Sequence, residues 1–296
     1  MTKILLVHGI NNENNTKATI EQDWGDAIRS GVNMPDNASI TAAFYGDVLH
    51  RETESWGQNE EVAAPMSAGS PDEDYADDGV AAFYLELQRA HSISDEDVAQ
   101  FLDEGEKLEH ARRMAKGVHK RWLKALARAL ENVLPTKGKF VARAFLGQAA
   151  AYLQKPGLKK KIDGLVVEQL FDDLEAEDDV IVISHSLGTV VSYEILRRLR
   201  NKVKAKLLLT MGSPLGIQIV QNRLGPPLVC LPNVAKWVNA SDPEDFVALR
   251  PSLTKQNFGC GNIENIDDLD NGEEDAHDVL MYLQHQVVSQ AIADQL

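Results

Sequence analysis

The stretch VIVISHSLGTVVSYEIL, residues 180–196, combines a strand, a sharp turn and a helix. Its β-branched apolar run predicts a buried strand over Val180–Ser184, and apolar residues at helical spacing predict a helix over Leu187–Arg200. Ser186 lies between them, flanked by the small residues Ser184 and Gly188, which let two backbone segments approach closely. A serine at such a turn stands at the N-terminus of a helix, whose positive end favours a developing negative charge. Ser186 is therefore the candidate nucleophile.

Strands and helices are expected to alternate on both sides of this stretch. Short apolar runs predict five further strands, at Lys3–His8, Ile40–Tyr45, Lys206–Met211, Val234–Ala240 and Gly261–Ile266. Helical spacing predicts a helix over Thr16–Ser30 with Thr16 as its N-cap, and a C-terminal amphipathic helix over Asp278–Leu296. The apolar face of that last helix carries Val279, Leu283, Val287, Ala291 and Ile292. This alternation is typical of an α/β fold with a mostly parallel six-stranded sheet covered by helices on both faces.

The alternation stops between residues 51 and 162. Residues 50–80 are rich in glycine, proline, serine and acids and are interpreted as a loop, whereas residues 80–155 are predicted to be helical throughout. We therefore expect residues 1–50 and 163–296 to form the α/β catalytic domain. Residues 51–162 are expected to form a large helical cap, or lid, inserted between the second and third strands.

Charge is distributed unevenly over the chain, whose formal net charge is −15. Such a balance argues against a nucleic-acid partner. Within the insertion, Glu52–Glu106 holds a single base, Arg89, among its acids, and Lys107–Lys161 holds only two acids, Glu109 and Glu131, among its bases. The insertion therefore joins an acidic block directly to a basic one.

The basic block contains an amphipathic pattern with two interpretations. One helical face carries Val118, Trp122, Leu126, Leu130 and Val133, and Lys116, Lys120, Lys124 and Arg128 lie away from it. In the first interpretation these basic cap helices meet an anionic membrane surface or a phosphorylated substrate. In the second, which is the more usual fate of such helices, the apolar face packs on the protein and the bases are solvated or paired with the acidic block.

Neither a metal site nor a cofactor is expected. The two cysteines, Cys230 and Cys260, have no CxxC spacing, and the acids at 72–78 lack the spacing of a calcium loop. No signal segment is recognisable, and no window reaches the roughly 18 to 20 apolar residues of a membrane span. Together with two thiols that we expect to be unpaired, these features favour a cytoplasmic location.

A nucleophilic serine needs a base, and the base needs an orienting acid, in the chain order serine, acid, histidine for this kind of turn. His277, in the loop before the last helix, is the candidate base; His285 is expected inside that helix, and His185 is interpreted as packing. Two acids, Asp242 and Asp245, follow the strand 234–240. Spacing from the strand slightly favours Asp242, whereas the apolar residues just past Asp245 favour Asp245, so both stay open.

Backbone donors for a developing oxyanion are the last element of such a site. One is expected to be the amide of Leu187, directly after the candidate nucleophile. The other is expected to be the amide of Ile10, which follows His8 and Gly9 at the end of the first strand. A glycine at this point lets the backbone approach a substrate closely.

Taken together, these motifs resemble those of the α/β-hydrolase superfamily. The matching pieces lie outside the insertion: LLVHGI (5–10), VIVISHSLGTVVSYEIL (180–196), LLLTMGSPLG (207–216), WVNASDPEDFVALRP (237–251) and AHDVLMYL (276–283). The segment around the acids is similar to one in DDHD-type phospholipases, where the matching aspartate is the triad acid. Asp245 occupies that position, and the resemblance therefore favours it over Asp242. The chain departs from these patterns at Ser184, where glycine is usual, at Phe246, where proline is usual, and in having no DDHD signature.

The resemblance implies a fold and an activity. The chain would begin on the third strand of the full fold, and the sheet order would be 40–45, 3–8, 180–184, 206–211, 234–240 and 261–266. The implied activity is that of a serine esterase or lipase, which cleaves a small-molecule or lipid carboxylic ester, phospholipids included, through an acyl-enzyme intermediate. The alternative is a catalytically silent or regulatory module that binds a protein partner or an anionic membrane through its charged cap.

Overall fold

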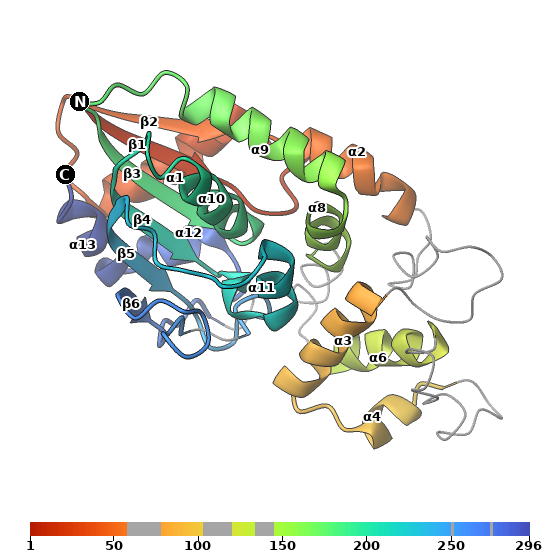
Figure 1. Ribbon diagram of the computed structural model, residues 1–296. Coiled ribbons are helices and arrows are strands. Elements are labelled where there is room, and N and C mark those ends of the chain that lie inside the picture. Colours follow the sequence, from red (N-terminus) through yellow and green to blue (C-terminus); the bar gives the residue numbers. More distant parts are fainter. Residues whose placement is uncertain (58–77, 103–119, 134–144, 250–251, 273–274) are drawn as a thin grey trace.

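A computed structural model describes residues 1–57, 78–102, 120–133, 145–249, 252–272 and 275–296 (Figure 1). Its centre is a six-stranded sheet in which every pairing is parallel, in the order β2-β1-β3-β4-β5-β6. The strands are β1 (Thr2–Val7), β2 (Ala38–Ala43), β3 (Asp179–His185), β4 (Ala205–Met211), β5 (Val234–Ala240) and β6 (Ile263–Ile266). The predicted α/β class, the parallel sheet and the strand order are confirmed.

Parallel pairing brings the ends of the central strands to one edge of the sheet. Val7 of β1 lies opposite Ser184 of β3, and His185 lies opposite Met211 of β4. Met211 in turn lies opposite Ala240 of β5. The loops that follow these four strands therefore start side by side, at the edge where α/β proteins place their functional groups.

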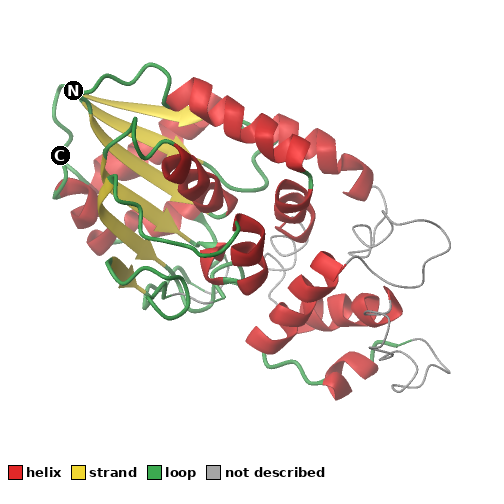
Figure 2. Ribbon diagram, viewed as in Figure 1, coloured by secondary structure: helices red, strands yellow, loops and turns green. Residues whose placement is uncertain are grey.

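Helices cover both faces of the sheet (Figure 2). Alternate residues of β1 point to opposite faces, so that Ile4 and Leu6 pack in one core and Leu5 and Val7 in the other. The helices of the first face are α1 (Lys17–Gly31), α12 (Val279–Gln284) and α13 (Gln286–Ala293). The second face is covered by α9 (Pro156–Leu170), α10 (Leu187–Arg198) and α11 (Gln218–Leu224). Thr16 caps α1 as predicted, since its side chain accepts a hydrogen bond from the Thr19 amide.

The segment between β2 and β3 is mostly helical in its described parts. It contains α2 (Gly46–Gly57), α3 (Asp78–Ala90), α4 (Asp95–Ala99), α6 (Lys120–Val133), the π-helical turn η2 (Phe145–Ala149), α8 (Ala150–Gln154) and α9. Residues 50–57 belong to α2, so the loop predicted from residue 50 is wrong there, and His91–Ser94 interrupt the helices expected over 80–155. Helix α9 runs across the expected domain boundary between residues 162 and 163.

The amphipathic basic helix is α6. Its apolar residues Trp122, Leu126 and Leu130 are buried, in the same core as Tyr84 of α3 and Val98 of α4. Figure 1 shows α3, α4 and α6 together, away from the sheet. The described apolar face of α6 is thus covered by protein, which favours the second interpretation of this helix. Lys116 and Val118 lie outside the described residues.

Two sequence-based expectations are wrong in the C-terminal half. The last helix is broken at His285 into α12 and α13, because the backbone there is extended, with φ −67° and ψ 129°. The break changes the helical phase, and Val287, placed on the apolar face, is 44% exposed. Cys230 and Cys260 form a disulfide rather than two free thiols. Free thiols therefore no longer support the expectation of a cytoplasmic location.

None of the helices in the described part of the chain has the length and apolar character needed to cross a membrane.

Candidate active site

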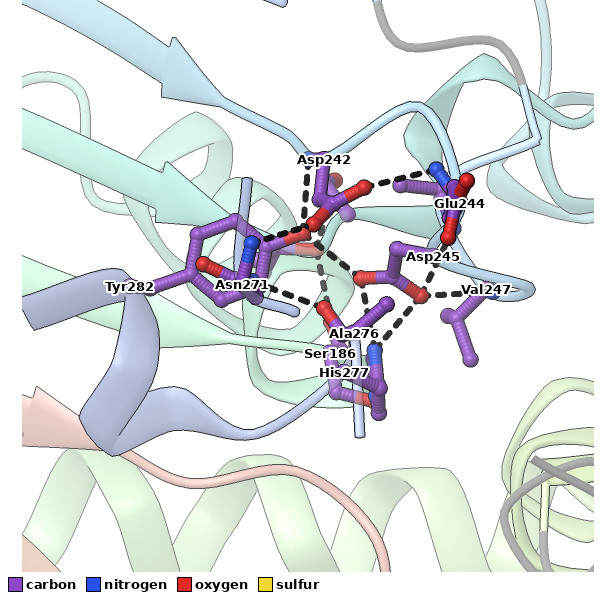
Figure 3. A network of polar contacts seen from close by, with 12 residues as sticks. Ser186, Asp242, Glu244, Asp245, Val247, Asn271, Ala276, His277 and Tyr282 are labelled. Carbon is purple, nitrogen blue, oxygen red and sulfur yellow. Dashed lines mark hydrogen bonds and ion pairs between the residues drawn. The ribbon is translucent and has the colours of Figure 1, made fainter. Parts of the chain in front are cut away.

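Four connecting segments meet at the edge of the sheet. Ser186 directly follows β3, both candidate acids follow β5, and His277 lies just before α12. The His8-Gly9-Ile10 segment follows β1. The candidate residues chosen from the sequence are thus brought to one region, and Figure 3 shows Ser186, both acids and His277 from close by.

Ser186 adopts a backbone conformation that non-glycine residues rarely use. Its φ is 54°, it is fully buried, and its Oγ has no hydrogen-bond partner among the described residues. Close backbone contacts surround the turn: a Cβ on Gly188 would lie 2.2 Å from the Val7 carbonyl oxygen, and one on Gly9 would lie 2.4 Å from Ser186 Cβ. These clashes explain why both positions need glycine. Strain of this kind is characteristic of functional turns.

His277 is paired with Asp245. Its Nδ1 lies 2.8 Å from both carboxylate oxygens of Asp245, and the Asp245 side chain is completely buried. A carboxylate can only accept, so Nδ1 carries a proton; in the neutral imidazole Nε2 then keeps its lone pair. Nε2 is buried and has no hydrogen-bond partner among the described residues. His277 therefore has the tautomer that a general base needs.

Asp242, the other candidate acid, has different hydrogen-bond partners. Its carboxylate accepts hydrogen bonds from the amides of Glu244, at 2.7 Å, and Asn271, at 2.6 Å. It thereby joins the loop after β5 to the chain that leads to His277. In the described part of the structure, Asp245 is the candidate acid that contacts His277, and Asp242 is not.

Tyr282 of α12 belongs to this network but was missed from the sequence. Its hydroxyl donates to Asp245 Oδ2 at 2.7 Å and accepts from the Asp242 amide at 3.0 Å. Burial raises the pKa of Tyr282 well above its ordinary value, and the nearby Asp245 charge adds to this effect, so the phenol stays protonated. Tyr282 lies on the buried face of a C-terminal helix, as core aromatic residues commonly do. The sequence pattern therefore gives no signal of its contact with Asp245.

His185 packs against the candidate base. Its ring centroid lies 4.5 Å from that of His277 and 6.4 Å from that of Trp24. Burial lowers the pKa of His185 well below its ordinary value, so it stays neutral. The packing role inferred from the sequence agrees with these ring contacts, and the contact with His277 adds that His185 forms one wall for the base.

His8 orders the loop that carries Ile10. Its Nδ1 donates to the Gly9 carbonyl at 2.8 Å, and its Nε2 accepts from the Tyr45 amide at 3.2 Å. The ring stacks on Tyr45, and the Tyr45 hydroxyl donates to the His8 carbonyl. Burial lowers the pKa of His8 to about 4, so it is neutral near pH 7.

The two amides expected to bind an oxyanion are both available as hydrogen-bond donors. Within the described part of the chain, the N–H groups of Ile10 and Leu187 have no acceptor. Leu187 is the first residue of α10, where an amide has no partner inside the helix. Ser186 Oγ and His277 Nε2 are not hydrogen-bonded to each other in this structure; catalytic contacts of this kind are often long without substrate.

Contacts of Glu86 and His91 tie the insertion to the sheet domain. Both carboxylate oxygens of Glu86 in α3 accept from amides at the start of α11, from Gln218 at 2.6 Å and from Ile219 at 3.0 Å. The His91 ring stacks on Phe246, the residue after Asp245, with a centroid distance of 4.9 Å. Phe246 stands where the resembling segment has proline, so this aromatic residue gives the insertion a contact on the acid loop.

Among the described residues, no group of three or more histidine, cysteine or acidic side chains is arranged to hold a metal ion. Comparison of the chain with protein-family models, with curated proteins and with solved structures found no match. The function is therefore proposed from the chemistry of the site.

Proposed function

We propose that the protein is a serine hydrolase that cleaves carboxylic esters through an acyl-enzyme intermediate. The observation that carries this proposal is the buried Asp245–His277 pair, with a base nitrogen left open, at the same sheet edge as the strained Ser186. The Ser-His-acid arrangement is recognised by geometry and roles, and the His277–Asp245 hydrogen bond at the sheet edge that carries Ser186 supports these roles.

In the first half of the reaction, Ser186 Oγ attacks the ester carbonyl carbon and its proton moves to His277 Nε2. The carbonyl oxygen becomes an oxyanion, which the amides of Ile10 and Leu187 bind. The intermediate collapses, the C–O bond of the ester breaks, and the alcohol leaves with the proton from His277. Asp245 holds the imidazole in place and stabilises its positive charge.

In the second half, water replaces the alcohol. His277 takes a proton from the water as its oxygen attacks the acyl carbon of the Ser186 ester. The second oxyanion uses the same two amides, and its collapse releases the acid and returns the proton to Ser186 Oγ. The cycle needs no group other than protein residues and water.

A panel of p-nitrophenyl esters with increasing acyl length tests this proposal. We expect the wild type to hydrolyse at least the shortest esters, and Ser186→Ala and His277→Ala each to lower kcat by about 1,000-fold or more. The preferred acyl length would also report whether a lipid-like ester fits. Ester turnover that survives in Ser186→Ala would contradict the proposal.

A further inference from the structure

The loop after β1 is anchored by a residue of the insertion. The backbone N–H of Asn11 donates to Oε1 of Gln148 at 3.0 Å, across 137 positions of sequence. Gln148 lies in the π-helical turn η2 and is only 7% exposed. Asn11 itself has φ of 56°, so the chain turns sharply here, directly after Ile10. A buried side chain of the insertion thus holds the turn that presents the Ile10 amide.

Two successive peptide groups decide where the Ile10 N–H points. The first joins the Gly9 carbonyl to the Ile10 N–H, and His8 Nδ1 holds that carbonyl at 2.8 Å. The second joins the Ile10 carbonyl to the Asn11 N–H. Asn12 Nδ2 donates to this carbonyl at 2.7 Å, while Gln148 accepts from this N–H. Because a peptide group is planar, contacts at both of its ends fix its orientation.

The side-chain amide of Asn12 is itself held in one orientation. Asn15 Nδ2 donates to Asn12 Oδ1 at 2.9 Å, which turns the Asn12 amide nitrogen toward the backbone carbonyls. Of the four polar groups in these two peptides, three are thereby held. The Ile10 N–H is the fourth, and it has no acceptor among the described residues.

We propose that Gln148 is a positioning residue for the oxyanion site, so that the insertion completes the catalytic machinery. This inference rests on the proposed function. Gln148 does not touch the substrate; it holds the Asn11 side of the turn so that the Ile10 N–H points to the reaction centre. The π-helical geometry of η2 is consistent with this role, because such turns occur frequently at functional sites.

The test compares two matched substitutions in the full-length protein. Gln148→Met keeps the side-chain volume and removes the strong acceptor. Gln88→Met is the control, since Gln88 is also in the insertion, is also 7% exposed and hydrogen-bonds Asp95 at 2.9 Å, away from the loop after β1. The probe is a fluorophosphonate, whose reaction with serine places a phosphoryl oxygen in the oxyanion site. Its second-order labelling rate is measured alongside kcat and KM for a short p-nitrophenyl ester.

A displaced oxyanion donor should slow the chemical step without changing how tightly the substrate binds in the ground state. We expect Gln148→Met to lower the labelling rate and kcat by about 10- to 100-fold with little change in KM, and Gln88→Met to match the wild type in all three. Thermal melts should show similar losses of stability for the two variants. Equal labelling rates for Gln148→Met and Gln88→Met would overturn the inference.

A second variant covers the case in which Gln148→Met does not fold. Asn12→Ala removes the contact at the other end of the same peptide group, and the inference expects a slower labelling rate there too; a wild-type rate would overturn it. Failure of the proposed function is distinguishable, because then the wild type would not be labelled at Ser186 at all. Labelling at Ser186 combined with insensitivity to both variants would refute the inference alone.

Discussion

The carboxylate of Asp245 accepts hydrogen bonds from three directions. His277 Nδ1 and the Tyr282 hydroxyl approach from the C-terminal segment, and the Val247 amide donates to Oδ1 at 2.8 Å from its own loop. A carboxylate satisfied in this way is fixed in orientation, and it fixes the imidazole in turn. Spacing alone left Asp242 and Asp245 open because both follow the same strand; the resemblance favoured Asp245, and Asp245 is the one that hydrogen-bonds His277.

Substitution of the two aspartates should therefore have opposite consequences. We expect Asp245→Asn to lower kcat for ester hydrolysis by about 100- to 10,000-fold, since the amide no longer enforces the tautomer of His277. Asp242→Asn should retain most of kcat and lower the free energy of unfolding by about 1–2 kcal/mol, because one of its two amide contacts is lost. Steady-state kinetics and denaturant titrations measure both quantities. A larger loss of kcat in Asp242→Asn would show that the acid is assigned wrongly.

The neutral, buried His8 makes stability depend on pH. Its pKa is lowered from 6.5 to about 4 on folding, so between these values the unfolded chain binds the proton more readily. Stability is then fully present above pH 6.5 and is lost as the pH falls toward 4, by about 3 kcal/mol in total. We expect His8→Asn, which keeps a donor for the Gly9 carbonyl, to reduce this loss in Tm measurements between pH 4 and 7.

The wild type, measured over the same pH range, is the reference for that comparison. If the Tm of His8→Asn fell between pH 7 and pH 4 by as much as the Tm of the wild type, the role given to His8 would be contradicted.

At the scale of elements, the sheet was the easiest part to predict. The central strands β1, β3 and β4 are mostly apolar and buried, as expected for parallel strands covered on both faces, and all six strands were predicted from the residues alone. The break at His285 has no local sequence signal, and the hydrogen bond between His285 Nε2 and Asn271 Oδ1, at 2.9 Å, exists only in the tertiary structure. The disulfide was missed for a similar reason: the spacing of Cys230 and Cys260 says nothing about their proximity in space.

The contact between α3 and α11 should hold the insertion on the sheet domain. In Glu86→Gln, one of the two α11 amides loses its carboxylate acceptor and faces an amide donor instead. We expect this to lower the free energy of unfolding by about 1–3 kcal/mol in a denaturant titration. Glu168→Gln, a change of the same type at an exposed position of α9, is the control and should alter stability little. Equal stabilities of the two variants would mean that the Glu86 contact does not anchor the insertion.

At the scale of the whole molecule, the charged blocks and the candidate catalytic residues lie in different parts of the chain. The acidic and basic blocks both lie between β2 and β3, whereas Ser186, Asp245 and His277 belong to the sheet domain. The insertion reaches the site through side chains that the charge pattern never indicated: Gln148 on the loop after β1 and His91 on Phe246. Sequence patterns reveal residues with recognisable chemistry, but a positioning residue is defined by its partner in space and carries no local signal.

The most direct test of the central claim is the mass of the protein after reaction with a fluorophosphonate, followed by peptide mapping. We predict one adduct per chain in the wild type, located on Ser186, and none in Ser186→Ala. An unmodified wild type, or an adduct at another residue, would contradict the account of Ser186 as the nucleophile.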